Sequence, residues 1–314
     1  MDKLWAMTVF ARVAEAGSFS RAAEALDLAN ASVTTCIRNL ERELGVALLH
    51  RDTRRLRTTE EGEAYLAHVR HILHAVEEAE ADVQSRQGAL SGRLVIETPI
   101  SFGHALLAPA LPRFAARYPG IATSVTLTNQ PHHLIERAID VAIRMDRVED
   151  AELVARPIYE AHYVPCCAPA LAGSVPAHPG ELDPRLCLGV LPEERVLPTP
   201  WVFTPEGGGE PVTLRPQGPL NFNSSDALAE AAISGAGVIN LLDIFVERHL
   251  SEGRLVPLFP GWYTPTKTFY AVTTRAQLAS AKVRAFNEFL AEIIDEEHRP
   301  ALHRSVQIRS IGVR

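Results

Sequence analysis

Apolar residues near the start of the chain recur at helical spacing. Val33, Ile37, Leu40 and Leu44 are separated by four, three and four residues, which places them on one side of a helix. The opposite side of this helix is small and polar at its start and cationic further on: Ala31, Thr35, Arg38, Asn39 and Arg42. A shorter helix precedes it over about 20–26, so the pattern predicts a helix–turn–helix pair.

Two polar residues are candidate caps for these helices. We expect Ser20 to cap the first helix of the pair. Asn30 either caps the second helix or reads an adenine base, and the pattern leaves both interpretations open. After Gly45 we expect a short strand over 46–49 and then the tip and return of a wing over 50–57.

Short polar side chains followed by arginines are typical of a helix that enters a DNA major groove, because they read base edges and hold phosphates. The arginines of 50–57 fit a solvated loop, but beside the helix pair we favour phosphate or minor-groove contacts. The predicted DNA-binding residues lie between Phe19 and Arg38 and in the wing: Ser20, Arg21, Asn30, Ser32, Thr34, Thr35, Arg38, Arg51, Arg54 and Arg55.

A long helix is predicted over about 59–87. Its apolar residues follow three- and four-residue steps: Leu66, Val69, Leu73, Val76 and Val83. Such a heptad-like seam needs a partner helix, so we expect a dimer or tetramer that presents two recognition helices to a two-fold DNA site. His68, His71 and His74 should face solvent on the other side of the helix, and we expect no metal there.

Strands and helices alternate after a glycine-containing hinge over 88–92. Strands are expected over 93–98, 121–128, 140–144 and 163–167, with helices over 101–117 and 134–138, in an order typical of a parallel sheet. The stretch 168–265 is richer in proline and glycine, with strands over 201–204, 212–215, 220–222 and 237–242 and helices over 227–234 and 244–252. A strand over 268–273 and a final helix then return, which indicates two α/β lobes joined by two crossing strands.

A ligand between two such lobes would lie at the ends of the strands. Ser101 is the leading candidate, because it would cap a helix beginning at Phe102 whose N–H groups hold a carboxylate; a plain cap without a ligand is the alternative. The remaining effector-site candidates are Thr98, Phe102, Asn129, Arg144, Asn223 and Ser224. Arg144 has a structural alternative, an ion pair with Asp140 or Asp146.

The run from Ser18 to Leu66 resembles the amino-terminal winged helix-turn-helix of LysR-type transcriptional regulators. The matching pieces are Gly17-Ser18-Phe19, Arg21-Ala22-Ala23, Val33, Ile37, Leu40-Glu41, Leu44-Gly45-Val46, Leu48-Leu49, Arg51 and Thr59-Glu60-Glu61-Gly62. Ala29 stands where the family usually has a serine cap, Asn30 where glutamine is common and Thr35 where arginine is common. These departures bear on the DNA sequence that is read and leave the binding mode unchanged.

The later chain resembles the family's effector domain more loosely, and that domain has the architecture of periplasmic binding proteins. The pieces are Pro99, Ser101-Phe102-Gly103, Pro112, Phe114, Tyr118-Pro119, Asp140 to Arg144, Gly235 and Gly237-Val238. We therefore expect an α/β protein with a winged helix-turn-helix domain over 1–59, a linker (dimerisation) helix over 60–88 and a two-lobed effector-binding domain over 93–296. Lobe I would cover about 93–162 and 267–296, lobe II about 163–266, and 297–314 would be a tail.

Composition narrows the class of protein. The 314 residues carry a net charge of −7, so DNA binding must come from a local cationic patch. The cysteines (Cys36, Cys166, Cys167 and Cys187) fit neither a metal spacing nor a disulfide frame, and the adjacent pair is either a redox sensor or two buried structural thiols. No signal peptide or membrane span is expected, so we expect a cytoplasmic protein. The motifs of catalysis are missing from the sequence, which predicts no enzyme and no cofactor.

The resemblance implies a sequence-specific regulator of transcription with two partners. One is double-stranded promoter or operator DNA, and the other is a small-molecule effector between the lobes, with organic acids among the candidates. The alternative is a solute-binding or enzymatic α/β protein with an incidental N-terminal helical domain. That alternative gives no reason for the wing arginines.

Overall fold

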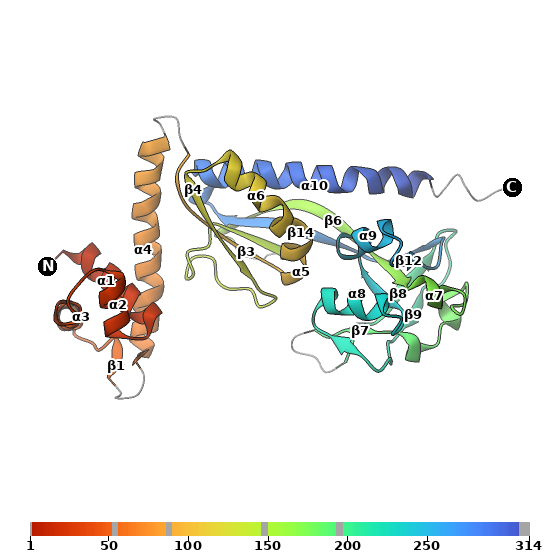
Figure 1. Ribbon diagram of the computed structural model, residues 1–314, viewed down its shortest axis with the longest axis horizontal. Helices are drawn as coiled ribbons and strands as arrows, with labels where there is room; N and C mark the ends of the chain where they lie inside the picture. The colour runs from red at the N-terminus through yellow and green to blue at the C-terminus, as the bar shows by residue number, and fades with distance from the viewer. Residues whose placement is uncertain (1, 52–55, 86–89, 146–149, 193–196, 308–314) are drawn as a thin grey trace.

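The computed structural model describes residues 2–51, 56–85, 90–145, 150–192 and 197–307. It consists of a helical N-terminal unit and a larger α/β unit, with the long helix α4 between them (Figure 1). The N-terminal elements are α1 (Lys3–Ala16), α2 (Phe19–Ala25), α3 (Asn30–Leu44), β1 (Leu49–Arg51), β2 (Leu56–Thr58) and α4 (Glu60–Ser85). The strand predicted over 46–49 therefore begins only at Leu49, and β1 and β2 form the antiparallel wing.

One hydrophobic core holds the N-terminal unit together. Val33, Ile37 and Leu40 of α3 are completely buried in it, as their spacing predicts. Gly62 lets α4 start directly against the chain before β1, because a Cβ atom there would lie 2.0 Å from the carbonyl oxygen of Leu48. The close approach fixes the wing to the first turn of the long helix.

The apolar seam of α4 packs against its own chain. Leu66 and Val69 are buried in the core shared with α1, and Leu73 is half-buried against it. The prediction that these residues face a partner helix is therefore wrong, because α1 already covers them. Val76 is half-buried, and the side chain of Val83 lies outside the described residues.

The α/β unit is built on a seven-stranded sheet of order β11-β6-β14-β5-β3-β4, with β12 also paired to β6. The strands are β3 (Gly92–Thr98), β4 (Ile121–Leu127), β5 (Val141–Met145), β6 (Leu153–Cys167), β11 (Ile239–Leu242), β12 (Val256–Pro257) and β14 (Thr266–Thr274). β3 runs parallel to β4 and β5, whereas β6 pairs antiparallel with β14 over its first part and with β11 and β12 near its end. The two crossing strands expected between the lobes are β6 and β14, and the strand predicted over 163–167 is only the end of β6.

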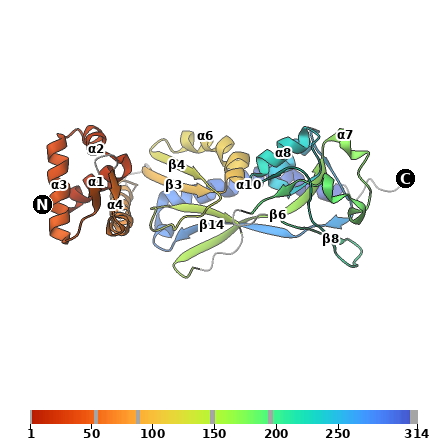
Figure 2. The same cartoon turned by 90° about the horizontal axis from the view of Figure 1, so that it is seen from below.

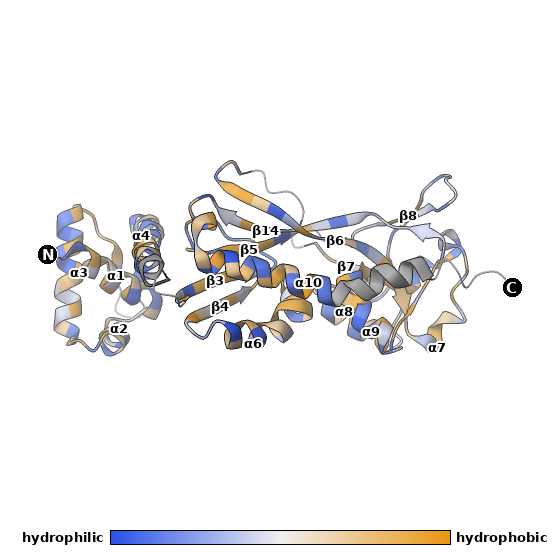
Figure 3. Ribbon diagram, turned by 90° about the horizontal axis from the view of Figure 1, so that it is seen from above, coloured by the Kyte–Doolittle hydropathy of each residue, from blue (hydrophilic) through white to orange (hydrophobic). Residues whose placement is uncertain are grey.

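Lobe I combines β3, β4 and β5 with α5 (Ile100–Phe102), a π-helical turn (Gly103–Leu107), α6 (Ala108–Arg117) and α10 (Ala281–Gln307). The coloured part of α10 carries both hydrophobic and hydrophilic residues, as expected for a helix with one face in a core (Figure 3). The helix predicted over 101–117 is present as a continuous helical run that contains one π turn. Two predictions are wrong here, since 134–138 forms turns and α10 extends into the segment that was expected to be a tail.

Lobe II contains α7 (Pro169–Ala172), β7 (Gly189–Val190), β8 (Trp201–Pro205), β9 (Val212–Leu214), β10 (Asn221–Phe222), α8 (Ser225–Ile233), α9 (Asp243–Ser251) and β13 (Trp262–Tyr263). Short 3-10 turns cover Pro179–Glu181 and Pro184–Leu186 in this lobe, and another covers Gln277–Ala279 before α10 of lobe I. The strands expected over 201–204, 212–215, 220–222 and 237–242 and the helices expected over 227–234 and 244–252 all have counterparts within a few residues. Across the parts of the chain that the structure describes, no helix is both long and apolar enough to cross a membrane.

Candidate functional site

The two helices of the predicted pair pack closely because small residues line their contact. Ala22 and Ala23 of α2 are buried against the N-terminal core, beside the buried face of α3. α3 lies at the outer end of the molecule, on the side away from the α/β unit (Figure 2). Its second face therefore remains open to solvent.

The predicted cap at Ser20 is wrong, and of the two interpretations of Asn30 the structure excludes the cap. Ser18 caps α2, since its extended backbone lets the side chain accept a hydrogen bond from the Arg21 N–H at 3.5 Å. Ala29 is the N-cap residue of α3 and makes no side-chain cap, and Asn30 is already helical. Asn30 instead donates from Nδ2 to Ser20 Oγ at 3.1 Å, so these two polar side chains join the starts of α2 and α3.

Most of the predicted DNA-binding side chains that the structure describes are exposed. Exposed members are Ser20, Arg21, Asn30, Ser32, Thr35 and Arg38. Thr34 is half-buried and donates to the backbone carbonyl of Asn30 at 2.9 Å. Arg51 belongs to β1, while Arg54 and Arg55 lie outside the described residues.

Glu41 positions the wing relative to α3. Its Oε1 atom accepts hydrogen bonds from the backbone N–H groups of Leu48 at 3.0 Å and Leu49 at 3.3 Å. Thr59 closes the other side, donating from Oγ1 to the carbonyl of Ala47 at 2.7 Å and accepting from the Gly62 N–H at 2.9 Å. These hydrogen bonds fix the start of β1 relative to α3 and to the first turn of α4.

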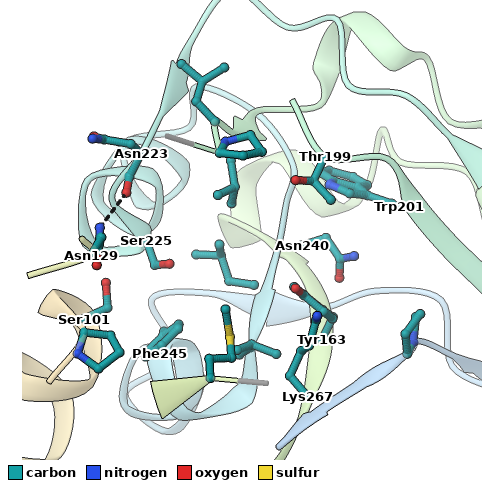
Figure 4. A pocket seen from close by; sticks show the side chains of 18 of the residues that line it. Ser101, Asn129, Tyr163, Thr199, Trp201, Asn223, Ser225, Asn240, Phe245 and Lys267 are labelled. Carbon is teal, nitrogen blue, oxygen red and sulfur yellow. Dashed lines mark hydrogen bonds between the residues drawn. The ribbon is translucent and has the colours of Figure 1, made fainter. Parts of the chain in front are cut away.

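A cavity of about 370 Å³ lies between the two lobes of the α/β unit (Figure 4). Three of the seven predicted effector residues line it: Ser101, Asn129 and Asn223. Hydrogen bonds join the lobes at this edge. Ser101 donates to Asp226 Oδ2 at 3.1 Å, and Asn129 donates from Nδ2 to the carbonyl of Asn223 at 3.3 Å. A change in the lobe angle would strain or break these bonds.

The predicted capping role of Ser101 and three further effector-site predictions are not supported by the geometry. Ser101 is the second residue of α5, whose N-cap residue is Pro99, so it does not cap the helix as predicted. Thr98 is buried, and Phe102 packs on Phe269 with ring centroids 4.9 Å apart. Ser224 caps α8 by accepting from the Ala227 N–H. Ser101 therefore lines the cavity without capping a helix, whereas Thr98, Phe102 and Ser224 are not part of the cavity lining.

Arg144 is also engaged elsewhere. It pairs with Glu97 Oε1 at 2.6 Å and donates to the carbonyl oxygen of His132 at 3.0 Å. The predicted alternative partner Asp140 is therefore wrong, and Asp146 lies outside the described residues. Glu97 is 1 % exposed, so the pair neutralises a buried carboxylate.

Sequence reasoning missed most of the cavity's polar lining. Asn240, Thr199 and Trp201 lie on one side of the cavity, opposite Ser101 and Asn129 (Figure 4). Asn240 is a polar residue inside the apolar strand β11, a signal that the sequence did contain. Lys267 comes from the crossing strand β14, and only the fold brings it to this site.

The α/β unit is joined to α4 through a buried polar cluster. His74 Nε2 lies 2.9 Å from Asp140 Oδ1 and 3.0 Å from Gln277 Nε2. Lys282 Nζ approaches the same Asp140 oxygen at 3.1 Å, and the Val95 N–H donates to the other at 2.6 Å. The prediction of a wet histidine face is wrong for His74, which is 7 % exposed because the α/β unit packs on this side of α4.

The adjacent thiols are buried in a sheet. Cys166 and Cys167 are inaccessible at the end of β6, and burial raises the pKa of both thiols. Burial likewise raises the pKa of Cys187 to about 12. A thiol held protonated and away from solvent is a poor nucleophile, so the geometry favours the structural interpretation of the pair. Among the described residues there is no cluster of potential metal ligands.

Comparison with known proteins identifies both units. Residues 87–294 match the model of the LysR substrate binding domain, and residues 4–63 match that of the bacterial regulatory helix-turn-helix protein, lysR family. The chain is 34 % identical to the HTH-type transcriptional regulator CrgA of Neisseria meningitidis serogroup B over 290 residues, covering 91 % of this chain and 95 % of that one. It is also 34 % identical over 290 residues to the HTH-type transcriptional regulator PtxR of Pseudomonas aeruginosa, covering 92 % of each. The solved structure of CrgA, a LysR-type transcriptional regulator, aligns with a TM-score of 0.59 at 32 % identity over 92 % of this chain and 97 % of that chain.

Proposed function

Because this chain belongs to the LysR family of DNA-binding transcriptional regulators, we propose that α3 and its wing bind promoter or operator DNA and that an effector in the cavity between the lobes modulates this binding. The observation that carries the proposal is the exposed polar and cationic face of α3 at the outer end of the molecule. The functional units would be the winged helix-turn-helix over 1–59, the linker helix over 60–88 and the two lobes over 93–296.

In the DNA complex, α3 would enter a major groove with its first turns against the bases. Ser32 and Thr35 present short hydrogen-bonding groups there, and Arg38 stands one turn further along for the backbone. Asn30 holds Ser20 through its amide, which leaves its carbonyl oxygen to accept from a base. The wing arginines Arg51, Arg54 and Arg55 would hold flanking phosphates.

We also propose self-association as a dimer or tetramer. Since α1 covers the predicted seam, the surface for a partner must be a different face of α4. Ile72, Ala75 and Ala79 are exposed and separated by three and four residues, which makes an apolar stripe on one face of the helix.

The effector acts in this proposal by its different affinity for two arrangements of the lobes. Lobe-bridging bonds from Ser101 and Asn129 define the arrangement in the structure, and a ligand that holds another lobe angle would change the spacing of DNA-binding units in the oligomer. Organic acids are the candidate effectors. The mechanism has no catalytic step, in keeping with a family of regulators, and action at promoters would put the protein in the cytoplasm.

Salt-dependent DNA binding tests the proposed interface. Arg38→Ala should weaken binding to all sequences and reduce the slope of log K against log salt by about 1, because one phosphate contact releases about one counterion. The control is Arg12→Ala, an exposed arginine of α1 beside the α/β unit, which should leave the slope unchanged. An equal slope in Arg38→Ala and the unaltered protein removes this face of α3 from the phosphate contacts.

Sequence preference is tested separately. Thr35→Ala or Ser32→Ala should change the sites selected from a random DNA pool while retaining non-specific affinity, because these side chains are proposed to read bases. Selection of the same sites by both variants would refute direct readout by this part of α3.

A further inference from the structure

The cavity between the lobes contains a buried amide without a complete set of partners. Asn240 is 5 % exposed, and its Oδ1 atom has no hydrogen-bond partner among the described residues. Leaving such an acceptor unpaired costs about 1–3 kcal/mol, so buried polar groups are nearly always satisfied. Among the described side chains whose buried polar atoms lack a partner, Asn240 alone lines this cavity.

The charge in the described lining of the cavity is positive. Lys267 is the one charged residue among the described residues that line it, and no carboxylate is present in that lining. An ammonium group in a pocket of low polarity attracts an anion and repels a cation. The site therefore favours an acid over an amine or a neutral sugar.

The remaining walls are mostly apolar and include the aromatic rings of Trp201, Phe245 and Phe269. The cavity of about 370 Å³ lies at the small end of the range of ligand pockets, about 300–1,000 Å³. This size suits a single aromatic ring with short substituents. Aromatic walls add contacts with a flat ring beyond simple burial.

We propose that the effector is a small aromatic carboxylate that also carries a hydroxyl or N–H donor. Its carboxylate meets Lys267, its ring lies among Trp201 and Phe245, and its donor satisfies the carbonyl oxygen of Asn240. Because the terminal torsion of an asparagine side chain is soft, the amide of Asn240 can turn its oxygen toward the ligand at small cost. This inference rests on the proposed function, since it names the chemical class of the effector at the same cavity.

Calorimetric titration of the full-length protein tests the class with defined probes. These are the three positional isomers of hydroxyphenylacetate, phenylacetate without a donor, and the hydroxyphenylacetamides without a charge. At least one hydroxyphenylacetate should bind about tenfold or more tightly than phenylacetate, the factor that one satisfied buried acceptor supplies. It should also bind more tightly than its own amide, which lacks the charge that Lys267 attracts. The class is wrong if no hydroxyphenylacetate binds, or if phenylacetate binds as tightly as the best isomer.

Variants assign the two contacts. Asn240→Leu should lower the affinity for the best hydroxyphenylacetate to that for phenylacetate, leave phenylacetate binding unchanged and not lower the melting temperature without ligand. The matched control is Asn287→Leu, which removes another buried unpaired amide oxygen, on α10 and away from the cavity, and should leave affinity unchanged. Lys267→Met should weaken both acids and leave the amide unaffected.

The comparison of probes on the unaltered protein remains decisive even if a variant fails to fold. Equal loss of phenylacetate and hydroxyphenylacetate binding in Asn240→Leu would overturn the assignment of Asn240 as the donor's partner. DNA binding without probe is measured separately by gel shift. If the protein binds DNA but shows no preference for a hydroxyphenylacetate, only the proposed class of effector is refuted. If the protein does not bind DNA, the proposed function is refuted.

Discussion

Removing the Arg144 guanidinium should destabilise the α/β unit without weakening effector binding. In Arg144→Met, Glu97 would remain 1 % exposed and lose the ion pair at 2.6 Å. Breaking a buried ion pair by removing one partner costs about 3–5 kcal/mol, because an uncompensated charge stays buried. Glu97 keeps the His132 N–H at 3.2 Å and the imidazole of His132, so we expect the lower end, about 3 kcal/mol.

Thermal unfolding of the full-length protein measures this loss. For a unit of about 200 residues, each kcal/mol shifts the melting temperature by about 2–4 °C, so the transition should fall by about 6–12 °C. The control is Arg156→Met, an exposed arginine on β6, which should change the melting temperature little. Replacing both partners, as in Glu97→Gln with Arg144→Met, should recover part of the loss.

Two results would refute the reasoning. If Arg144→Met has the same melting temperature as the Arg156→Met control, the ion pair between Arg144 and Glu97 does not stabilise the fold. If Arg144→Met melts normally and loses affinity for hydroxyphenylacetates while retaining DNA binding, Arg144 belongs to the ligand site after all, as the sequence alone suggested.

Two further predictions concern the histidines. Asp243 accepts a hydrogen bond from His162 at 2.8 Å, which raises the pKa of His162 above 6.5. The hydrogen bond between His162 and Asp243 therefore stabilises the fold fully below about pH 6.5, and this stabilisation is lost as the pH rises through the raised pKa. His162→Gln should lower the melting temperature more at about pH 6 than at about pH 8.5. Equal losses of melting temperature at the two pH values would contradict this linkage. His74→Ala should lower the free energy of unfolding by about 2 kcal/mol, because it removes a buried hydrogen-bonding group. The control His71→Ala, at an exposed residue, should change it by no more than about 0.5 kcal/mol. Equal stability of the two variants in urea unfolding would show that the contact between His74 and Asp140 does not stabilise the fold.

The family could be predicted from the sequence because its signals are local. Periodicity placed Val33, Ile37 and Leu40 on one face of a helix, and an ordered set of residues from Ser18 to Leu66 carried the resemblance that the comparisons confirm. The fold class is confirmed for the same reason, since alternating strands and helices are written in the spacing of apolar residues. The helix caps could not be predicted as well, because periodicity locates the start of a helix only to within one or two residues. Ser18 and Ser20 are therefore both possible caps of α2, and only the structure shows that Ser18 is the cap.

Contacts between distant segments required the tertiary structure. The seam of α4 looked like a dimer surface until α1 covered it, and His74 looked exposed until the α/β unit packed on that side of the helix. The candidate effector residues divided in the same way: Ser101 and Asn129 reach the cavity, while Arg144 is taken by Glu97, which lies far from it in sequence. Periodicity reports which face of an element is apolar, but only the packing of all elements decides what lies against that face and which polar groups are left to meet a ligand.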